Sequence, residues 1–398
     1  MAGDAGGRRG SGGDSLASAV PPVRGADQVK RLEGALVLGG GPAGAAAAIW
    51  LARAGRQVTL WEKERLSHHK ICGEFLSWEA QAYLGDLGLD LAALGAVEIE
   101  RVRMVTARRT VEGRLGFTAR SLTRRVLDAA LLDVAAASGA TVEHGVAARE
   151  LLPSGEVVAG QGAVKPGALF LATGKSNLRG CMRDGEGTLN QQLGFKAYFR
   201  LAPAERAALA GHVELMLFKG GYAGLQLVER DAANLCFLVS PERWKACGGD
   251  FHALLADLAA EVPHLARRLA GAVPLLDRPL AISGVPYGFL HRPSGGDSIW
   301  RLGDQAAVIP SFSGDGMSLA LHSARLATGA LLTGRGPQDY ARQLAKDAGG
   351  AVRRAAWLQR MSGREGWVER VALLPGVLGL GARVTRLSGR AVRRARAV

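Results

Sequence analysis

The sequence predicts an α/β fold in which a doubly wound domain is interrupted by an antiparallel β-sheet and followed by a helical C-terminus. Three observations predict this fold. A short apolar run from Ala35 to Leu38 meets three glycines and is followed by an alanine-rich helix. Strand-like segments joined by glycine or polar turns fill the stretch from about 190 to 290. A buried strand at 298–302 then leads into a second glycine-punctuated helix start.

The composition indicates a folded protein of two or three domains. Of its 398 residues, 48% are hydrophobic and 22% are charged, which excludes wholesale disorder. Every apolar run is shorter than the roughly 18 residues of a membrane-spanning helix. The net charge of +14 invites a nucleic-acid-binding interpretation. Aromatic residues are only 6%, however, and no nucleic-acid-binding motif is present, so we expect a small-molecule substrate and no nucleic acid.

The cysteine pattern and the N-terminal residues suggest a compartment. Cys72, Cys181, Cys236 and Cys247 form no Cys-x-x-Cys pair, so we expect neither a metal site nor a disulfide scaffold. Residues 1–31 contain too few apolar residues to fold and lack the apolar core of a secretion signal. We therefore expect a disordered leader and a cytoplasmic protein.

The first half of the chain alternates strands and helices. Pro42 to Arg53 is predicted as a helix, and Gly55 suits the left-handed position that follows a helix. Gln57 to Trp61 is a second strand. The other elements expected in this half are a helix over 122–138 and strands over 141–143 and 168–172. In the middle of the chain we expect strands at 195–201, 213–218, 224–228 and 234–239.

The strongest functional signal is the turn Gly39-x-Gly41-x-x-Gly44 between the first strand and its helix. The first glycine permits a tight turn, the second lets a pyrophosphate approach the backbone, and the third lets the helix pack against the sheet. Glu62 ends the next strand, roughly 20 residues further on, where its carboxylate can bind both ribose hydroxyls and repel a 2′-phosphate. The pattern predicts a Rossmann-like site for FAD or NAD. We also expect Pro42, Ala43 and Lys63 to border it.

A second constellation favours FAD over NAD. Asp304, after Gly303, ends a strand where its carboxylate can bind the ribityl chain of a flavin. A helix begins shortly afterwards, and its N–H groups can stabilise negative charge on the flavin pyrimidine ring. This helix is opened by Gly314, Asp315, Gly316 and Met317. The alternative is an ordinary strand–turn–helix unit with a capping aspartate.

These motifs together resemble the flavoprotein oxidoreductases of the p-hydroxybenzoate hydroxylase fold, most closely the geranylgeranyl reductase-like branch. The resemblance implies that Arg124 contacts FAD, that Asp304 holds the ribityl hydroxyls, and that residues 314–317 border the isoalloxazine. The matching motifs are GGGPAGAAAA at 39–48, KICGE at 70–74, LTRRVLD around Arg124, LATGKSNLRG at 171–180 and GDQAAVIPSFSGDGMSLAL at 303–321.

The expected domain boundaries follow from the motifs and the change of character in the middle. The FAD-binding domain has two parts, 32–185 and 291–345. The substrate-domain sheet, 186–290, is inserted between them, and basic helices occupy 346–398.

Two departures from the family pattern bear on the reaction. The aromatic hydroxylases carry an Asp-Gly pair after the strand near 172, in a loop that touches both FAD and NADPH. This chain has Ala-Thr-Gly-Lys at 172–175, so NAD(P)H is only a candidate electron donor. The halogenases of this fold carry Trp-x-Trp-x-Ile-Pro, and no two tryptophans here are two positions apart, which disfavours halogenation.

Candidate side chains for chemistry are few. Cys72 lies in KICGE, where positive charge from Lys70, His68 and His69 would activate its thiol. It is either a redox group beside the cofactor or a small buried residue. The candidate substrate-pocket residues are Lys196, Tyr198, Phe218 and Tyr222 in the middle sheet. No side chain is assigned a catalytic role.

The C-terminal stretch 365–398 is strongly basic, with seven arginines against two acidic residues beside the apolar run 371–380. A basic amphipathic segment can lie on an anionic membrane surface, so a peripheral membrane contact is one interpretation. The alternative, which is favoured, is a solvated helix that covers the flavin domain.

The sequence therefore predicts an FAD-dependent oxidoreductase. The leading interpretation is a monooxygenase of secondary metabolism that hydroxylates a phenolic or polyketide-derived molecule, with an external hydride donor. The alternative is a geranylgeranyl reductase-type enzyme that reduces an isoprenoid double bond, which KICGE and the missing Asp-Gly pair favour. A non-catalytic nucleotide- or nucleic-acid-binding protein has no need for two flavin-facing helix starts.

Overall fold

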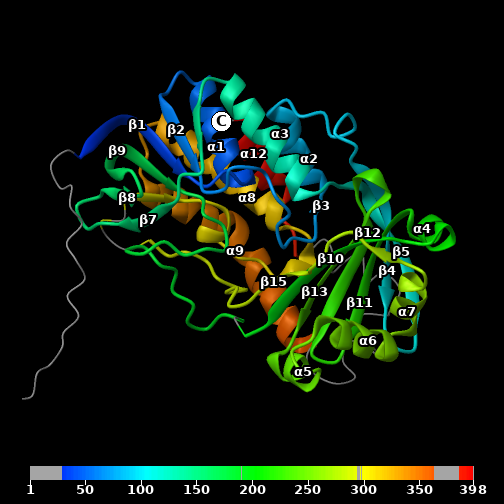
Figure 1. Cartoon of the computed structure of the whole chain (residues 1–398). Coiled ribbons are helices and arrows are strands. Elements are labelled where there is room, and N and C mark those ends of the chain that lie inside the picture. Colours follow the sequence, from blue (N-terminus) through cyan, green and yellow to red (C-terminus); the bar gives the residue numbers. More distant parts are fainter. Residues whose placement is uncertain (1–28, 190, 294–295, 297, 363–384, 398) are drawn as a thin grey trace, which may run out of the picture.

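The computed structural model describes residues 29–189, 191–293, 296, 298–362 and 385–397 (Figure 1). Most of the expected leader and the apolar run at 371–380 lie outside these residues. The described chain forms two β-sheets with helices on their faces, which confirms the predicted α/β fold.

The first sheet is the core of a Rossmann-like domain. Its strand order is β6-β2-β1-β9, with β16 beside the C-terminal half of β9, and all these strands are parallel. Because parallel strands end at the same edge, the turns that follow β1, β2, β9 and β16 meet there. The strands are β1 (Lys30–Leu38), β2 (Val58–Glu62), β6 (Thr141–His144), β9 (Gly162–Leu171) and β16 (Ile299–Arg301), with β7 (Ala148–Leu151) and β8 (Val157–Ala159) added antiparallel.

The helix α1 (Pro42–Arg53) is the predicted one, residue for residue, and it lies between α3 (Arg124–Ala137) and α8 (Gly316–Leu332). Its alanines at 45–48 are fully buried, which permits this close packing. Gly55 adopts φ 73° after the helix, as predicted. The remaining helices of this domain are α2 (Trp78–Asp86), α9 (Pro337–Ser362) and α12 (Gly389–Arg396).

The second sheet has the order β14-β10-β13-β12-β11-β4-β5-β3, with β15 also paired to β10. All its pairings are antiparallel except β11 with β4, which is parallel. Its strands are β3 (Phe75–Leu76), β4 (Val97–Val105), β5 (Thr110–Ser121), β10 (Leu193–Arg200), β11 (Gly211–Phe218), β12 (Gly221–Leu227), β13 (Ala233–Val239), β14 (Val273–Pro274) and β15 (Leu280–Ile282).

This sheet reaches further back in the sequence than the expected boundaries. Strands β3, β4 and β5 belong to it, although the boundaries left 75–121 in the first part of the FAD-binding domain. The cause is the long-range pairing of Gly211–Met216 with Ile99–Val105, which no local pattern reveals.

The two faces of the second sheet have different neighbours. The outer face packs against α6 and α7 through a core that includes Met216, Leu225 and Phe237 (Figure 1). The inner face presents the alternate residues, among them Leu215 and Leu238, toward the first domain. The helices α4 (Pro203–Leu209), α5 (Pro241–Ala246), α6 (Phe251–Glu261) and α7 (Pro263–Leu269) all belong to this second part of the molecule.

The described part of the basic C-terminus packs against helices of the first domain. Val392 of α12 is fully buried, and the helix contacts α2 and α8. Arg394 pairs with Asp347, and the Arg396 Nε lies 2.6 Å from Asp86 Oδ2. Among the helices that the structure describes, none combines the length and apolar character needed to cross a bilayer.

Candidate active site

The glycine turn after β1 forms the first wall of the site. Gly39 has φ 107°, and a Cβ there would lie 2.5 Å from the Ala172 carbonyl oxygen. A Cβ at Gly44 would lie 1.9 Å from the Gly39 oxygen, so both positions need glycine for the fold itself. A Cβ at Gly41 would instead lie 3.1 Å from the end of the Arg124 side chain and meet no backbone atom. Gly41 thus keeps space free at the N-terminus of α1, where unpaired helix N–H groups can bind a pyrophosphate.

Glu62 is fixed at the end of β2, facing this turn. Its Oε2 accepts a hydrogen bond from the Gly40 N–H at 2.7 Å, and its Oε1 accepts one from the Glu64 N–H at 3.1 Å. A carboxylate oxygen accepts more than one hydrogen bond, so both oxygens can also receive ribose hydroxyls. Glu62 lines a small second pocket, whereas Lys63 lines neither pocket and lies 3.7 Å from Glu64.

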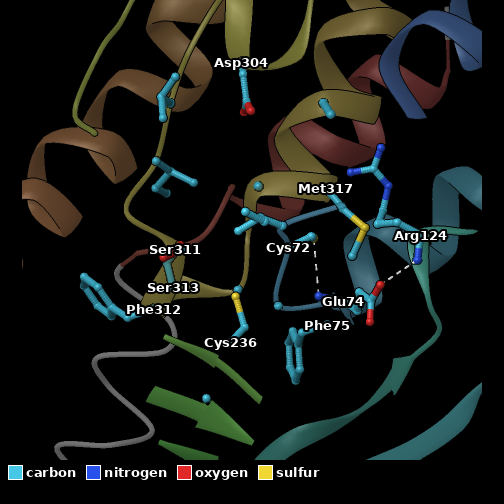
Figure 2. Close-up of a pocket in the computed structure, with 18 of the residues that line it drawn as sticks. Cys72, Glu74, Phe75, Arg124, Cys236, Asp304, Ser311, Phe312, Ser313 and Met317 are labelled. Carbon is cyan, nitrogen blue, oxygen red and sulfur yellow. Dashed lines mark hydrogen bonds between the residues drawn. The ribbon is translucent and has the colours of Figure 1, made fainter. Parts of the chain in front are cut away.

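A cavity of about 270 Å³ lies between the two sheets (Figure 2). It joins the turn after β1, the KICGE loop, the start of α3, the loop after β9, residues 303–317 and the inner face of the second sheet. The predicted cofactor residues that line it are Gly41, Pro42, Ala43, Cys72, Arg124, Gly303, Asp304, Gly314, Gly316 and Met317. Two glycine-rich turns that are far apart in the sequence therefore open on one space.

Arg124 is held rigidly at the cavity wall. Its Nε and Nη2 donate to the two oxygens of Asp128 at 2.7 and 2.8 Å, in a two-pronged ion pair. Burial opposes the charge on Arg124, but Asp128 outweighs it and raises the pKa of the guanidinium. The result is a fixed positive charge beside Gly41, which suits a phosphate or another oxygen-rich group.

Asp304 and the loop after β9 form the next part of the wall. Lys175 Nζ lies 3.4 Å from Asp304 Oδ2, and Arg183 donates to the Asp304 backbone oxygen at 2.9 Å. Burial opposes the charge on Lys175, but Asp304 raises the pKa of the ammonium above its usual value. In the sequence, Lys175 stands out only because Ala-Thr-Gly-Lys at 172–175 replaces the Asp-Gly pair. Its place in the cavity depends on the meeting of β9 and β16, which are far apart in the chain.

The N-terminus of α8 opens on the cavity through Gly316 and Met317 (Figure 2). Asp315 is different, because its side chain turns away from the cavity. Its carboxylate accepts hydrogen bonds from Ser318 Oγ at 2.9 Å and from the Leu387 N–H at 3.0 Å. Asp315 thus anchors the C-terminal segment, and burial raises the pKa of its carboxyl.

The inner face of the second sheet supplies an apolar wall. Tyr222 lines the cavity, hydrogen-bonds Ser311 and packs edge-on against Phe312 at 5.9 Å between ring centroids. The expectation that Phe218 also lines it is wrong. Alternation along β11 places Phe218 on the outer face with Met216, where the Arg243 guanidinium lies 5.2 Å from its ring.

Lys196 and Tyr198 lie behind the cavity rather than in it. Lys196 Nζ is 2.6 Å from Glu74 Oε1, and both side chains are 0% exposed. Tyr198 donates to both Glu74 oxygens, at 2.7 and 2.9 Å. Glu74 itself lines the cavity, and burial raises the pKa of its carboxyl. The sequence contained Glu74 within KICGE, but its burial against a strand more than 100 residues away gave no local signal.

Two cysteines line the cavity. Cys72 Sγ accepts the Glu74 N–H at 3.3 Å (Figure 2). Burial raises the pKa of the Cys236 thiol to about 12, so this thiol stays protonated.

Arg386 is a cavity residue that sequence analysis missed. Its guanidinium lies 4.3 Å from the Phe117 ring and 3.4 Å from Glu79 Oε2. It reaches the wall because Leu387 is tied to Asp315, so the C-terminal segment folds back across the start of α8. The sequence around Arg386 predicted only a basic C-terminal stretch and gave no sign of a contact with the cavity.

Known proteins provide sequence relatives of this chain. Residues 37–95 match the family model described as an NAD(P)-binding Rossmann-like domain. The chain is 28% identical over 337 residues to a menaquinone reductase of Mycolicibacterium smegmatis, covering 77% of each protein. A menaquinone reductase of Mycobacterium tuberculosis is 48% identical over 54 residues, which is 14% of this chain and 13% of that protein.

Solved structures provide relatives of the fold. A flavoprotein/dehydrogenase from Cytophaga hutchinsonii superimposes with a TM-score of 0.72 at 16% identity, covering 92% of this chain and 99% of that one. The flavin-dependent brominase Bmp2 gives 0.70 at 18% identity, covering 92% and 98%. The myxobacterial chondrochloren halogenase CndH gives 0.68 at 17% identity, covering 92% and 96%. The chain therefore has the fold of flavin-dependent oxidoreductases, while the geranylgeranyl reductase-like branch stays a prediction.

Proposed function

We propose that this chain binds FAD and uses it to reduce a double bond in an apolar, isoprenoid-type substrate. One observation carries the proposal. Residues predicted to hold the pyrophosphate and the flavin ring open on one cavity, and the opposite wall of that cavity is the apolar inner face of the second sheet. A cofactor and a hydrophobic substrate would thus meet in a space shielded from water.

The residues present fit FAD. Gly41 leaves room that a side chain would fill, and Arg124 supplies a fixed positive charge beside it. Glu62 offers carboxylate oxygens to a ribose, Asp304 offers them to a ribityl chain, and the N-terminus of α8 faces the cavity for the pyrimidine edge. When bound and reduced, the flavin would supply a hydride.

The chain's own contribution to such a reaction is binding, orientation and exclusion of water. Leu215, Leu238 and Val308 would contact the hydrocarbon part of the substrate. Tyr222 and Ser311 form the polar pair on the same wall, suited to an oxygen of a substrate head group. Burial of these contacts disfavours water and side reactions.

The reductase is favoured over the monooxygenase for two reasons. The relative that covers most of this chain is named a menaquinone reductase, and menaquinone is a prenylated, largely apolar molecule. In addition, Lys175 and Asp304 pair where the aromatic hydroxylases would have their Asp-Gly loop. NAD(P)H remains a candidate donor for reducing the flavin.

The test uses the purified, FAD-loaded protein, photoreduced under argon and mixed with menaquinone. A reductase reoxidises the flavin without oxygen and yields a product that carries two additional hydrogens on its prenyl chain, detected by mass spectrometry. Flavin that stays reduced until oxygen is admitted, with an oxygen atom then found in an added phenol, would instead establish the monooxygenase.

A further inference from the structure

We propose that His69, Tyr198 and Glu74 form a proton relay from solvent to the cavity. The inference rests on the proposed function, because reduction of a carbon–carbon double bond consumes one proton for every hydride. The relay would supply that proton, a role that the cofactor-binding residues leave unfilled.

The three side chains form a continuous chain of hydrogen bonds. His69 Nδ1 lies 3.0 Å from the Tyr198 hydroxyl oxygen. The same hydroxyl lies 2.7 and 2.9 Å from the two oxygens of Glu74. His69 is partly exposed, Tyr198 and Glu74 are buried, and Glu74 lines the cavity. The chain therefore leads from the protein surface to the cavity wall without a gap.

The two oxygens of Glu74 have unequal surroundings. Oε1 accepts from Lys196 Nζ at 2.6 Å and from the Arg124 N–H at 2.8 Å, as well as from Tyr198. The contact described for Oε2 is with Tyr198. Oε2 is therefore the oxygen that can hold a proton. Lys196 also donates to the Lys70 carbonyl oxygen at 3.0 Å, which keeps the ammonium bound when Glu74 is neutral.

Burial favours the neutral form of both Glu74 and His69. Burial raises the pKa of Glu74, with Lys196, Arg124 and Tyr198 opposing the rise. Burial, Lys196 and then Arg125 lower the pKa of His69 to about 4, against a smaller opposite effect of Glu229. A neutral imidazole can accept a proton at one nitrogen while it donates from the other.

The backbone holds Glu74 in a conformation that is rare for its residue type. Glu74 has φ 60°, in the left-handed region that favours glycine. The preceding Gly73 carbonyl oxygen accepts hydrogen bonds from Gln226 and Asn234, both at 3.0 Å. The second sheet thus imposes the strained turn that places Glu74 at the cavity wall, and such strain is concentrated at functional sites.

The step balances as follows. One alkene carbon receives a hydride from the reduced flavin, which is oxidised, and the π bond is lost. The other carbon receives the proton from Glu74 Oε2. Glu74 regains a proton from the Tyr198 hydroxyl, which takes one from His69 Nδ1, and His69 takes one from water at Nε2.

The first test is Tyr198→Phe in the FAD-loaded protein, which removes one oxygen from the relay. We expect flavin reoxidation by menaquinone in a single turnover to slow by on the order of 100-fold. The matched control is Tyr83→Phe, which removes another buried hydroxyl, 2.7 Å from His322 Nδ1. FAD affinity should match wild type in both variants, and only Tyr198→Phe should slow turnover. In His69→Ala, added imidazole should restore the rate, which a purely structural role would not permit.

A second readout needs no substrate. Photoreduction of bound FAD, with EDTA as the electron donor, takes up protons at the flavin, so the pH-indicator signal, corrected with a free-FAD blank for protons released by the donor, should lag behind flavin bleaching in Tyr198→Phe and not in wild type. Slowed uptake in a protein that leaves menaquinone unchanged would support the relay and overturn the proposed function. Equal uptake and equal turnover in Tyr198→Phe and wild type would overturn the relay alone. A protein that binds no FAD would overturn both.

Discussion

The second sheet buries one glutamate against each of its faces, and the two are held differently. On the outer face Glu214 is 0% exposed, with Arg268 Nη2 at 2.7 Å, His264 Nε2 at 2.8 Å and Arg103 also bonded to it. On the inner face Glu74, equally buried, has one cationic side chain, Lys196, and the hydroxyl of Tyr198. The same residue type thus meets three basic side chains on one side of the sheet and one on the other.

The difference decides what each carboxyl can do. Burial raises the pKa of Glu214, but His264 and Arg268 outweigh it and lower the value to about 2. Burial prevails at Glu74, where the pKa is raised. A carboxylate saturated by cations fixes structure, whereas one with a single cation and a hydroxyl keeps an affinity for protons. Burial alone therefore does not identify a carboxyl that can exchange protons. The number of cationic side chains bonded to the carboxyl must be considered as well.

The largest expected effect is on stability, at the outer face. Glu214→Gln leaves the Arg268 guanidinium buried without its counter-charge, and arginine cannot lose its proton. We expect the free energy of unfolding to fall by about 3–5 kcal/mol, measured by urea denaturation. FAD content per folded molecule should stay at the wild-type level. A loss below about 1 kcal/mol would remove the contrast between the two faces.

The corresponding change at the inner face should cost less stability and more activity. Glu74→Gln leaves Lys196 without a carboxylate, but its ammonium keeps the hydrogen bond to the Lys70 carbonyl oxygen at 3.0 Å. We expect a loss of about 1–3 kcal/mol in unfolding free energy and a single-turnover rate lower by on the order of 100-fold. Equal rates in Glu74→Gln and wild type would contradict the assignment of a proton-donating role.

The pH dependence of stability should differ in sign between the two glutamates. The stabilisation from Glu214 is fully present above the unfolded pKa of 4.5 and is lost as the pH falls toward its folded pKa of about 2. Because the folded pKa of Glu74 is raised, its contribution runs the other way, and stability falls as the pH rises above 4.5 toward that pKa. The unfolding free energy of each variant should be measured across this pH range. Glu214→Gln should not lose stability as the pH falls below 4.5, and Glu74→Gln should not lose stability as the pH rises above 4.5.

The smallest expected effects are those of substituting Phe218 and Tyr222, two aromatic residues that lie on adjacent strands and face opposite sides of the sheet. Phe218→Leu changes the outer face and should lower the free energy of unfolding by about 1 kcal/mol without altering substrate affinity. Tyr222→Phe removes the hydroxyl bonded to Ser311 on the cavity wall and should raise KM for menaquinone by about 2- to 10-fold. Thermal denaturation and steady-state kinetics on both variants check this. A change of KM in Phe218→Leu would indicate that the substrate binds at the outer face, which would contradict the assignment of the cavity as the substrate site.

The first domain could be predicted from the sequence because glycine and helix signals are local. The turn Gly39-x-Gly41-x-x-Gly44 defined the boundaries of α1, and Glu62 ended β2 as expected. The second glycine-rich turn, at 303–317, lies beside the first, as the FAD hypothesis required.

The rest depends on contacts that local patterns do not encode. The addition of β4 and β5 to the second sheet rests on a parallel pairing across more than 100 residues. Phe218 was misplaced because its strand was recognised but its register relative to the cavity was not. The positions of Glu74 and Arg386 could not be predicted, because each is set by contacts with segments that are distant in the sequence.

The central claim is that the cavity between the two sheets holds FAD, and Gly41 provides the most direct test. A Cβ at Gly41 meets no described backbone atom within 4 Å, and its contact is the end of the Arg124 side chain at 3.1 Å, so Gly41→Val should fold while filling the pyrophosphate cradle. Gly113→Val is the matched control, since a Cβ there meets no described atom within 4 Å. Flavin absorbance after reconstitution should indicate one FAD per chain in wild type and Gly113→Val, and none in Gly41→Val. Colourless wild-type protein, or full FAD retention in folded Gly41→Val, would contradict the account.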